Sequence, residues 1–160
     1  MNMNQRLLSL IRENARLTDE QLAKMLNTTA ESIRCDLAEM EAEGIICGYH
    51  TVVDWNKLDE DAVTAMIELH VIPRKNTGFD ELAEEILQYS EVESLCLMSG
   101  GYDFSVMVKG RSFREVANFV ATRLATLDGV QSTATHLVLK HYKDSGVLFE
   151  GEKKDERGEP

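Results

Sequence analysis

Two apolar runs joined by a short glycine-containing turn constrain the fold of this chain more than any other feature. Residues 95–109 read Leu-Cys-Leu-Met-Ser-Gly-Gly-Tyr-Asp-Phe-Ser-Val-Met-Val-Lys. Two apolar runs around such a turn are typical of a β-hairpin. Gly100 and Gly101 can take positive φ and leave main-chain N–H groups open to a ligand. Tyr102 and Asp103 add a ring, a hydroxyl and a carboxylate. Taken alone, residues 95–109 predict only a hairpin with a tight turn. The elements on both sides of the hairpin must decide whether the turn also binds a ligand.

The pattern around this hairpin predicts the element order β-α-β-β-α-β. That order is the split βαβ, or ferredoxin-like, unit, in which a four-stranded antiparallel sheet carries both helices on one face. The other face holds Thr64, Met66 and His70, or the residues that alternate with them, and is too apolar as a set to remain fully exposed to water. We therefore expect a second copy of the sheet to cover it in a symmetric dimer. The predicted elements are a strand from Ala62 to Pro73, a helix over 78–90, strands over 92–98 and 103–109, a helix from Ser112 to Gly129 that starts with a Ser112–Glu115 capping box, and a strand over 130–142.

Three short amphipathic helices are predicted before this unit. Capping boxes at Thr18–Gln21 and Thr28–Glu31 open the second and third helices. Asn27 stands in the turn between them, and Gly44 ends the third. Such a turn between two helices indicates a helix-turn-helix, with a plain three-helix bundle as the alternative. The predicted inward faces comprise Leu7, Leu10, Ile11, Leu22, Ala23, Leu26, Ile33, Leu37 and Met40.

The chain is thus predicted to be an α+β protein in four segments. Residues 1–50 form the helix-turn-helix domain, 51–61 a linking strand and hinge, 62–146 the ferredoxin-like domain and 147–160 a charged tail. No apolar run approaches the roughly 20 residues that span a bilayer, and no export pattern opens the chain, so we expect a cytoplasmic protein with no membrane partner. Cys35, Cys47 and Cys96 are odd in number and unpaired in spacing, which favours reduced thiols.

A specific set of motifs resembles the feast/famine, or Lrp/AsnC, family of transcriptional regulators. The first is Gly-Gly-Tyr-Asp at residues 100–103, in the central hairpin of a ferredoxin-like unit that follows a helix-turn-helix and a linking strand. The second is Leu-Asp-Gly-Val at 127–130, followed by Ser132, Thr133 and Thr135. The third is Glu-Gly-Ile-Ile at 43–46, followed by Gly48 and Tyr49. The resemblance covers about residues 4–142.

What the resemblance implies is a ligand-responsive regulator of transcription, not an enzyme. Family members dimerise by packing sheet against sheet and often form octamers. They bind double-stranded DNA, and their effectors, usually amino acids, bind near the hairpin turn where subunits meet. Free N–H groups at the turn suit a carboxylate, and Asp103 suits an ammonium. We expect no cofactor, metal or catalytic residue. The implied effector-binding residues are Gly100, Gly101, Tyr102, Asp103, Thr133 and Thr135.

The predicted recognition helix departs from the family, because basic residues are common on its exposed face there and only Arg34 is basic here. Residues 1–50 hold five Lys/Arg against eight Asp/Glu, a net charge of −3, and the whole chain has a net charge of −11. DNA affinity depends on phosphate neutralisation, so a single dimer should bind weakly. Helix N-termini and the multivalency of an octamer can compensate. The predicted DNA-contacting residues are Thr28, Thr29, Ser32, Arg34 and Cys35.

Two other functions stay open at this point. One is an effector-binding oligomeric module that has lost DNA binding, which a gel shift would distinguish. The other is a haem-biosynthesis decarboxylase, because those enzymes have a similar domain plan with a degenerate DNA-binding helix. The few basic residues of this acidic chain argue against an acidic tetrapyrrole substrate, and co-purified pigment would reveal one. Cys35 is either an inert residue of the recognition face or a redox switch.

Overall fold

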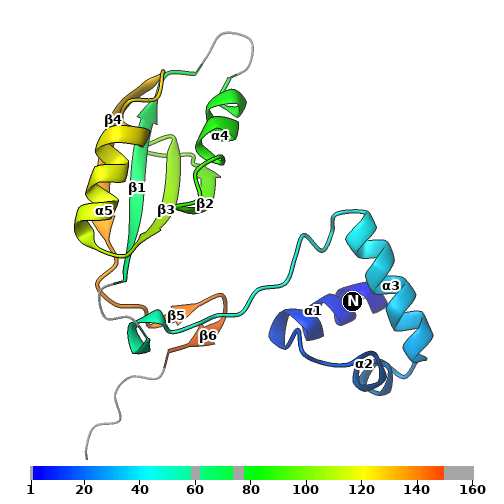
Figure 1. Cartoon of the computed structure of the whole chain (residues 1–160). Helices are drawn as coiled ribbons and strands as arrows, with labels where there is room; N and C mark the ends of the chain where they lie inside the picture. Colours follow the sequence, from blue (N-terminus) through cyan, green and yellow to red (C-terminus); the bar gives the residue numbers. More distant parts are fainter. Residues whose placement is uncertain (1, 59–61, 74–77, 150–160) are drawn as a thin grey trace, which may run out of the picture. The chain divides into compact units, whose positions relative to one another are not determined.

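The computed structural model describes residues 2–58, 62–73 and 78–149, which form two compact units (Figure 1). Of the described residues, 2–53 and 143–148 belong to the first unit, and those from 54 to 142 together with Phe149 belong to the second. The fold is the predicted α+β arrangement, with helices first and an antiparallel sheet after them. Each unit has its own hydrophobic core.

The first unit contains helices α1 (Met3–Glu13), α2 (Asp19–Leu26) and α3 (Ala30–Ala42). The Thr18 hydroxyl accepts a hydrogen bond from the Gln21 N–H, and the Gln21 side chain reaches back, so this predicted capping box is confirmed. Asn27 adopts the left-handed conformation at φ 55°, as the turn requires. The core of this unit confirms the predicted inward faces: its buried residues are Leu7, Leu22, Ala23, Leu26, Ile33 and Met40.

Two predicted caps are wrong in detail. Helix α3 begins one residue later than expected, because Thr29, and not Thr28, accepts the hydrogen bond, from the Ser32 N–H. At α5 (Phe113–Phe119), Ser112 does cap the helix, but the Glu115 carboxylate reaches past it to the Arg111 N–H at 2.6 Å. That hydrogen bond, followed by one from the Arg111 guanidinium, holds the pKa of Glu115 below its ordinary value. In α3 the hydroxyl one residue further along the chain caps the helix. At α5 the Glu115 carboxylate bonds to the N–H of Arg111 instead of that of Ser112.

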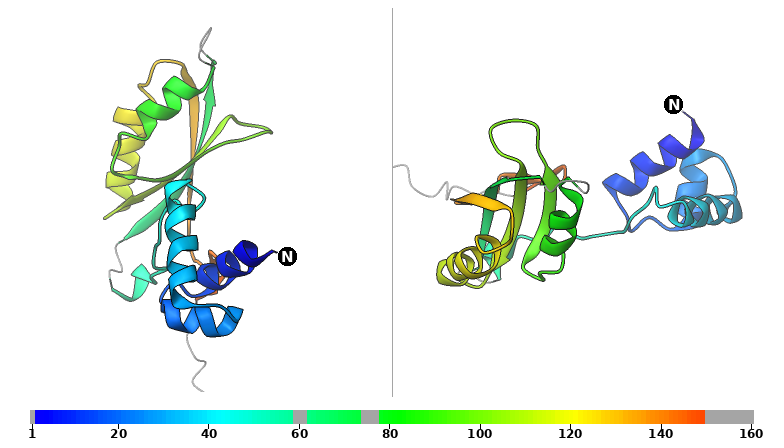
Figure 2. Two further views of the ribbon diagram at one scale, coloured as in Figure 1. Left: turned by 90° about the vertical axis from the view of Figure 1, so that its right-hand side faces the viewer. Right: turned by 90° about the horizontal axis from the view of Figure 1, so that it is seen from above.

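The second unit has the predicted order β-α-β-β-α-β. Before α5 it contains β1 (Val63–Val71), α4 (Asp80–Ile86), β2 (Val92–Leu97) and β3 (Phe104–Gly110), and β4 (Val130–Leu137) follows α5. The strand order in the sheet is β2-β3-β1-β4, and all pairings are antiparallel. Helices α4 and α5 lie on one face of the sheet, and among the described residues of this unit no helix lies on the other face (Figure 2). Helix α5 continues directly into a π-helical turn over Val120–Leu124.

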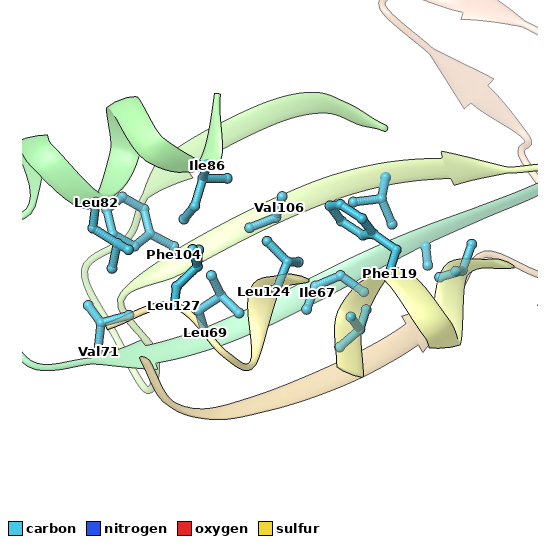
Figure 3. Packing of buried hydrophobic residues seen from close by; sticks show 14 residues of the cluster. Ile67, Leu69, Val71, Leu82, Ile86, Phe104, Val106, Phe119, Leu124 and Leu127 are labelled. Carbon is cyan, nitrogen blue, oxygen red and sulfur yellow. The ribbon is translucent and has the colours of Figure 1, made fainter. Parts of the chain in front are cut away.

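The core of this unit lies between the helices and alternate residues of the two central strands. Strand β1 buries every second residue, and β3 does the same opposite it. Phe104 packs edge-on against Phe79, with 5.8 Å between ring centroids. Figure 3 shows this cluster. Its buried members are Ala65, Ile67, Leu69, Val71, Leu82, Ile86, Phe104, Val106, Val108, Val116, Phe119, Val120, Leu124 and Leu127.

Several predicted boundaries shift. Phe113 and Leu87 are apolar and yet 58% and 59% exposed, because each stands at an end of its helix, beyond the turn that packs on the sheet. The last strand ends at Leu137 instead of Tyr142. A separate hairpin follows, formed by β5 (Lys143–Asp144) and β6 (Val147–Leu148), and it belongs to the first unit.

The expected linking strand makes no strand pairing where the structure describes it. Residues 51–54 have no regular structure, and Trp55–Lys57 form a 3₁₀ turn. Residues 59–61 of the predicted hinge lie outside the described part. The turn is anchored instead by Trp55, whose ring centroid lies 3.5 Å from the Lys109 Nζ atom of β3. A cation over an aromatic face is favourable, so this contact holds the segment against the sheet.

We expect Phe104→Ala to destabilise the second unit by about 3–5 kcal/mol, because it removes a buried ring from a closely packed core. Urea denaturation followed by circular dichroism measures the change. Leu97→Ala on the same hairpin is the control: Leu97 is 56% exposed, and its truncation should cost no more than about 0.5 kcal/mol. Equal losses in the two variants would contradict the burial described above.

Candidate functional site

The turn between β2 and β3 is held in place by Asp103. Its main-chain N–H donates to the Leu69 carbonyl oxygen at 2.9 Å, and its carbonyl oxygen accepts from the Met98 N–H at 2.7 Å. Its carboxylate Oδ2 accepts from the Val71 N–H at 2.9 Å. The sequence predicted a carboxylate free to meet an ammonium, and it did not reveal this main-chain partner. The position of the acid directly before the first residue of a strand is the only signal that points to it.

Gly100 and Gly101 lie exposed in this turn. Glycine can take positive φ, but neither of these two glycines does so here. A Cβ atom added at either glycine would meet nothing within 4 Å. Within the described part of the chain, the main-chain N–H groups of residues 99–102 have no hydrogen-bond acceptor. The turn therefore presents free donors because it has left the sheet, and not because of glycine strain.

Thr133 and Thr135 lie on β4, which is separated from β3 by β1. Thr133 is opposite Leu69, which is in turn opposite Phe104, so Thr133 lies at the same end of the sheet as the turn. Two strand spacings place it about 10 Å from β3. Thr135 lies one step further along, opposite Ile67. Thr133 is half-buried, whereas Thr135 and the two glycines are exposed and Tyr102 is half-buried. The chain thus gathers the turn and Thr133 at one end of the sheet.

The sheet face away from the helices, which no described helix of the second unit covers, is mixed in character. The pairing register places Met66 beside Met107 and His136 on this face. The His136 Nε2 atom lies 3.3 Å from the Glu68 Oε1 atom. By strand alternation, the face comprises Thr64, Met66, Glu68, His70, Ser94, Cys96, Ser105, Met107, Ser132, Ala134 and His136.

The predicted DNA-contacting residues lie at the start of α3 and in the turn before it. The Thr29 hydroxyl accepts from the Ser32 N–H at 3.2 Å, so these two residues form the helix cap. Thr28 is half-buried in the turn, and Cys35 is exposed. All five residues therefore belong to one local structure at the N-terminal end of α3.

Arg34 has an acidic partner that the sequence analysis missed. Its Nε atom lies 3.2 Å from the Asp19 Oδ2 atom, at the first residue of α2. Glu20, the next residue, has its pKa held below the ordinary value, first by its own main-chain N–H and then by the Thr18 hydroxyl. The start of α2 therefore brings two negative charges close to the one basic residue of α3.

The described residues contain no group of three or more histidine, cysteine or acidic side chains placed to hold a metal ion. Among those same residues, no helix has the length and apolar character needed to cross a bilayer. The cysteines at positions 35, 47 and 96 are all free thiols.

Comparison with known proteins places the chain among regulators of transcription. Residues 64–148 match the family model of the Lrp/AsnC ligand binding domain. An uncharacterised HTH-type transcriptional regulator of Bacillus subtilis, YugG, is 43% identical over 152 residues, which cover 94% of this chain and 92% of that protein. The leucine-responsive regulatory protein of Haemophilus influenzae is 22% identical over 143 residues, with 89% and 86% covered.

Solved structures share the fold. A transcriptional regulator of Neisseria meningitidis in complex with L-Met superposes with a TM-score of 0.74 at 22% identity, covering 90% of this chain and 92% of that one. Escherichia coli AsnC superposes with a TM-score of 0.68 at 24% identity, covering 88% and 93%. At these identities the likeness concerns the fold alone.

The glycine geometry gives a direct test. We expect Gly101→Ala to change the free energy of unfolding by no more than about 0.5 kcal/mol, because the position has open space and no positive φ. Gly129→Ala is the matched comparison: φ there is +96°, which an L side chain adopts only under strain, so a loss of about 1 kcal/mol or more is expected. Thermal and urea unfolding measure both. A larger loss for Gly101→Ala than for Gly129→Ala would refute the turn geometry.

Proposed function

The chain belongs to the Lrp/AsnC family of HTH-type transcriptional regulators, and from that premise we propose that it binds DNA and senses an amino acid at the turn of residues 99–103, where subunits meet. The chain has a ligand-binding domain, and its family and relatives regulate transcription and are not enzymes. The decarboxylase alternative is therefore set aside.

One observation carries the proposal of an effector site: among the described residues, the main-chain N–H groups of residues 99–102 have no hydrogen-bond acceptor. Unpaired main-chain donors in a turn suit an anion such as a carboxylate. Tyr102 stands beside them with an aromatic ring and a hydroxyl group. Thr133 supplies a further hydroxyl at the same end of the sheet, and Thr135 is proposed to contribute at its margin.

An amino acid is the effector class that these groups favour. Its carboxylate fits the main-chain donors, and its side chain can contact the Tyr102 ring. A structural neighbour that shares the fold was solved as an L-Met complex. We propose that further contacts come from a neighbouring subunit, because the turn is too exposed to enclose a small molecule alone.

A homodimer is proposed to form through the uncovered sheet face, and an octamer is proposed to assemble from it. The face carries Met66 and Met107 side by side, together with the Glu68–His136 pair. Burying the methionines against a second copy removes apolar surface from water. Assembly also multiplies weak DNA contacts.

DNA contact is proposed for the start of α3. Thr28, Thr29 and Ser32 lie at the helix N-terminus, where main-chain N–H groups and hydroxyls suit phosphates. Arg34 and Cys35 follow on the exposed surface of the helix. On binding, Arg34 exchanges Asp19 for a phosphate, an exchange that breaks an exposed ion pair worth at most about 1 kcal/mol.

A second function is favoured by the same ion pair: an effector-binding oligomer that no longer binds DNA. The only basic residue of α3 is paired with an acid, and the first 50 residues carry a net charge of −3. A gel shift at low salt with the upstream region of the protein's own gene separates the two functions. A retarded complex is expected, and its absence would leave the second function.

Effector binding is tested by thermal unfolding with each of the twenty amino acids in turn. A ligand at about 100 times its Kd stabilises the folded chain by about 2.7 kcal/mol, which raises the Tm by several degrees. Tyr102→Ala should shrink the shift, whereas Tyr142→Ala, on an exposed residue after β4, should not. A positive amino acid whose shift is unchanged by Tyr102→Ala would place the site elsewhere.

The role of Arg34 is tested by the salt dependence of DNA affinity. We expect Arg34→Ala to reduce the slope of log K against log[salt] by about 0.9 for each helix bound, because one phosphate contact is lost. Asp19→Asn should raise affinity up to about fivefold per subunit with an unchanged slope, since the competing ion pair is removed. Glu13→Gln on α1 controls for charge alone. An unchanged slope in Arg34→Ala would show that this residue contacts no phosphate.

A further inference from the structure

We propose that Asp103 is a positioning residue of the effector site, whose carboxylate holds the end of β1 so that the turn of residues 99–102 can leave the sheet with its N–H groups free. This inference rests on the proposed effector site and assigns Asp103 a role different from pairing with an ammonium group. With Asp103 in this role, the main contribution of the turn to binding is recognition of the effector's carboxylate.

Three groups of Asp103 bind the two strands on either side of it. The main-chain N–H bonds to Leu69 of β1, the main-chain carbonyl bonds to Met98 next to β2, and the carboxylate bonds to Val71 of β1. The three donor–acceptor distances lie between 2.7 and 2.9 Å, which is good geometry for N–H···O bonds. Asp103 is thus the last residue of the hairpin that still bonds to both neighbours.

The carboxylate performs a task that a main-chain oxygen performs elsewhere in the sheet. The pairing of β1 with β3 ends at Leu69 and Phe104. The next N–H group on the β3 side of β1 is that of Val71, and it needs another acceptor. Val71 is only 5% exposed, and a buried N–H without a partner is costly. Because the side chain of Asp103 accepts this bond, the main chain of Tyr102 and of the glycines need not stay beside β1.

The release of the turn is what creates the anion site. If residue 102 had to supply the acceptor, the turn would remain in the ladder and its N–H groups would lie along the sheet. With the carboxylate in that position, residues 99–102 form a loop outside the strand pairing, and their main-chain N–H groups have no acceptor among the described residues. The acid also places a negative charge next to these donors, and this charge repels an incoming carboxylate. Removing the charge alone should therefore not weaken effector binding.

The conservative substitution therefore separates positioning from charge pairing. In Asp103→Asn the side-chain oxygen can still accept from the Val71 N–H, while the charge is gone. In Asp103→Ala both are lost. If Asp103 positions the turn, the asparagine variant binds an amino-acid effector as tightly as the native chain or more tightly, and the alanine variant loses at least about tenfold. Glu93→Gln, which removes a charge from an exposed position of β2, is the control.

The experiment has two readouts on the full chain. Hydrogen exchange of the Val71 amide needs no ligand: it should stay slow in the native chain, Asp103→Asn and Glu93→Gln, and become fast in Asp103→Ala. Isothermal titration then uses whichever of the twenty amino acids stabilises the native chain, and compares Kd among the four proteins.

Each outcome has a distinct meaning. Equal loss of affinity in the asparagine and alanine variants would overturn the proposal, because charge would then be the requirement. Unchanged Val71 exchange in Asp103→Ala would overturn it as well. If none of the twenty amino acids binds the native chain, the proposed effector class fails, and the exchange readout still decides whether the carboxylate holds the turn. If Asp103→Ala does not fold, preserved affinity and slow exchange in Asp103→Asn support the proposal, and their loss overturns it.

Discussion

Burial of one face of the antiparallel sheet is the constraint on which the second unit depends. Every second residue of β1 and β3 enters a core beneath α4 and α5. A shift of one residue in the pairing would expose that entire set, so the register is strongly determined. The register in turn decides that Leu69 stands between Phe104 and Thr133, and it thereby brings the turn and the last strand to one end of the sheet.

The same alternation leaves the opposite face with a set of small, polar and thioether side chains. This is the surface through which we propose that two copies of the chain pack together. The proposed contact with DNA adds a reason for assembly. Helix α3 has one basic residue, and this residue is paired with Asp19. We therefore expect phosphate contact by a single subunit to be weak, and the proposed assembly would multiply such contacts.

In the central hairpin, the side chain of Asp103 explains the exposed turn better than the backbone angles of the glycines do. The Gly-Gly-Tyr-Asp run correctly marks an exposed turn with free N–H groups. Left-handed glycines do not produce it, because φ is positive at Gly44, Gly78, Gly129 and Gly146 and not at Gly100 or Gly101. A side-chain acceptor on Asp103 ends the ladder instead. The glycines leave space above the main chain, and the acid lets the main chain turn away.

Local patterns in the sequence determined the helices, the four strands of the main sheet and the buried faces of both cores, because apolar periodicity and helix caps act between residues close along the chain. Thr18, Asn27 and the alternation from Val63 to Val71 could be interpreted in this way. Tertiary structure alone decided which distant groups meet: Arg34 with Asp19, Trp55 with Lys109 and Asp103 with Val71. These pairs are 15, 54 and 32 residues apart. No periodicity encodes such contacts, since they exist only once packing has brought the elements together.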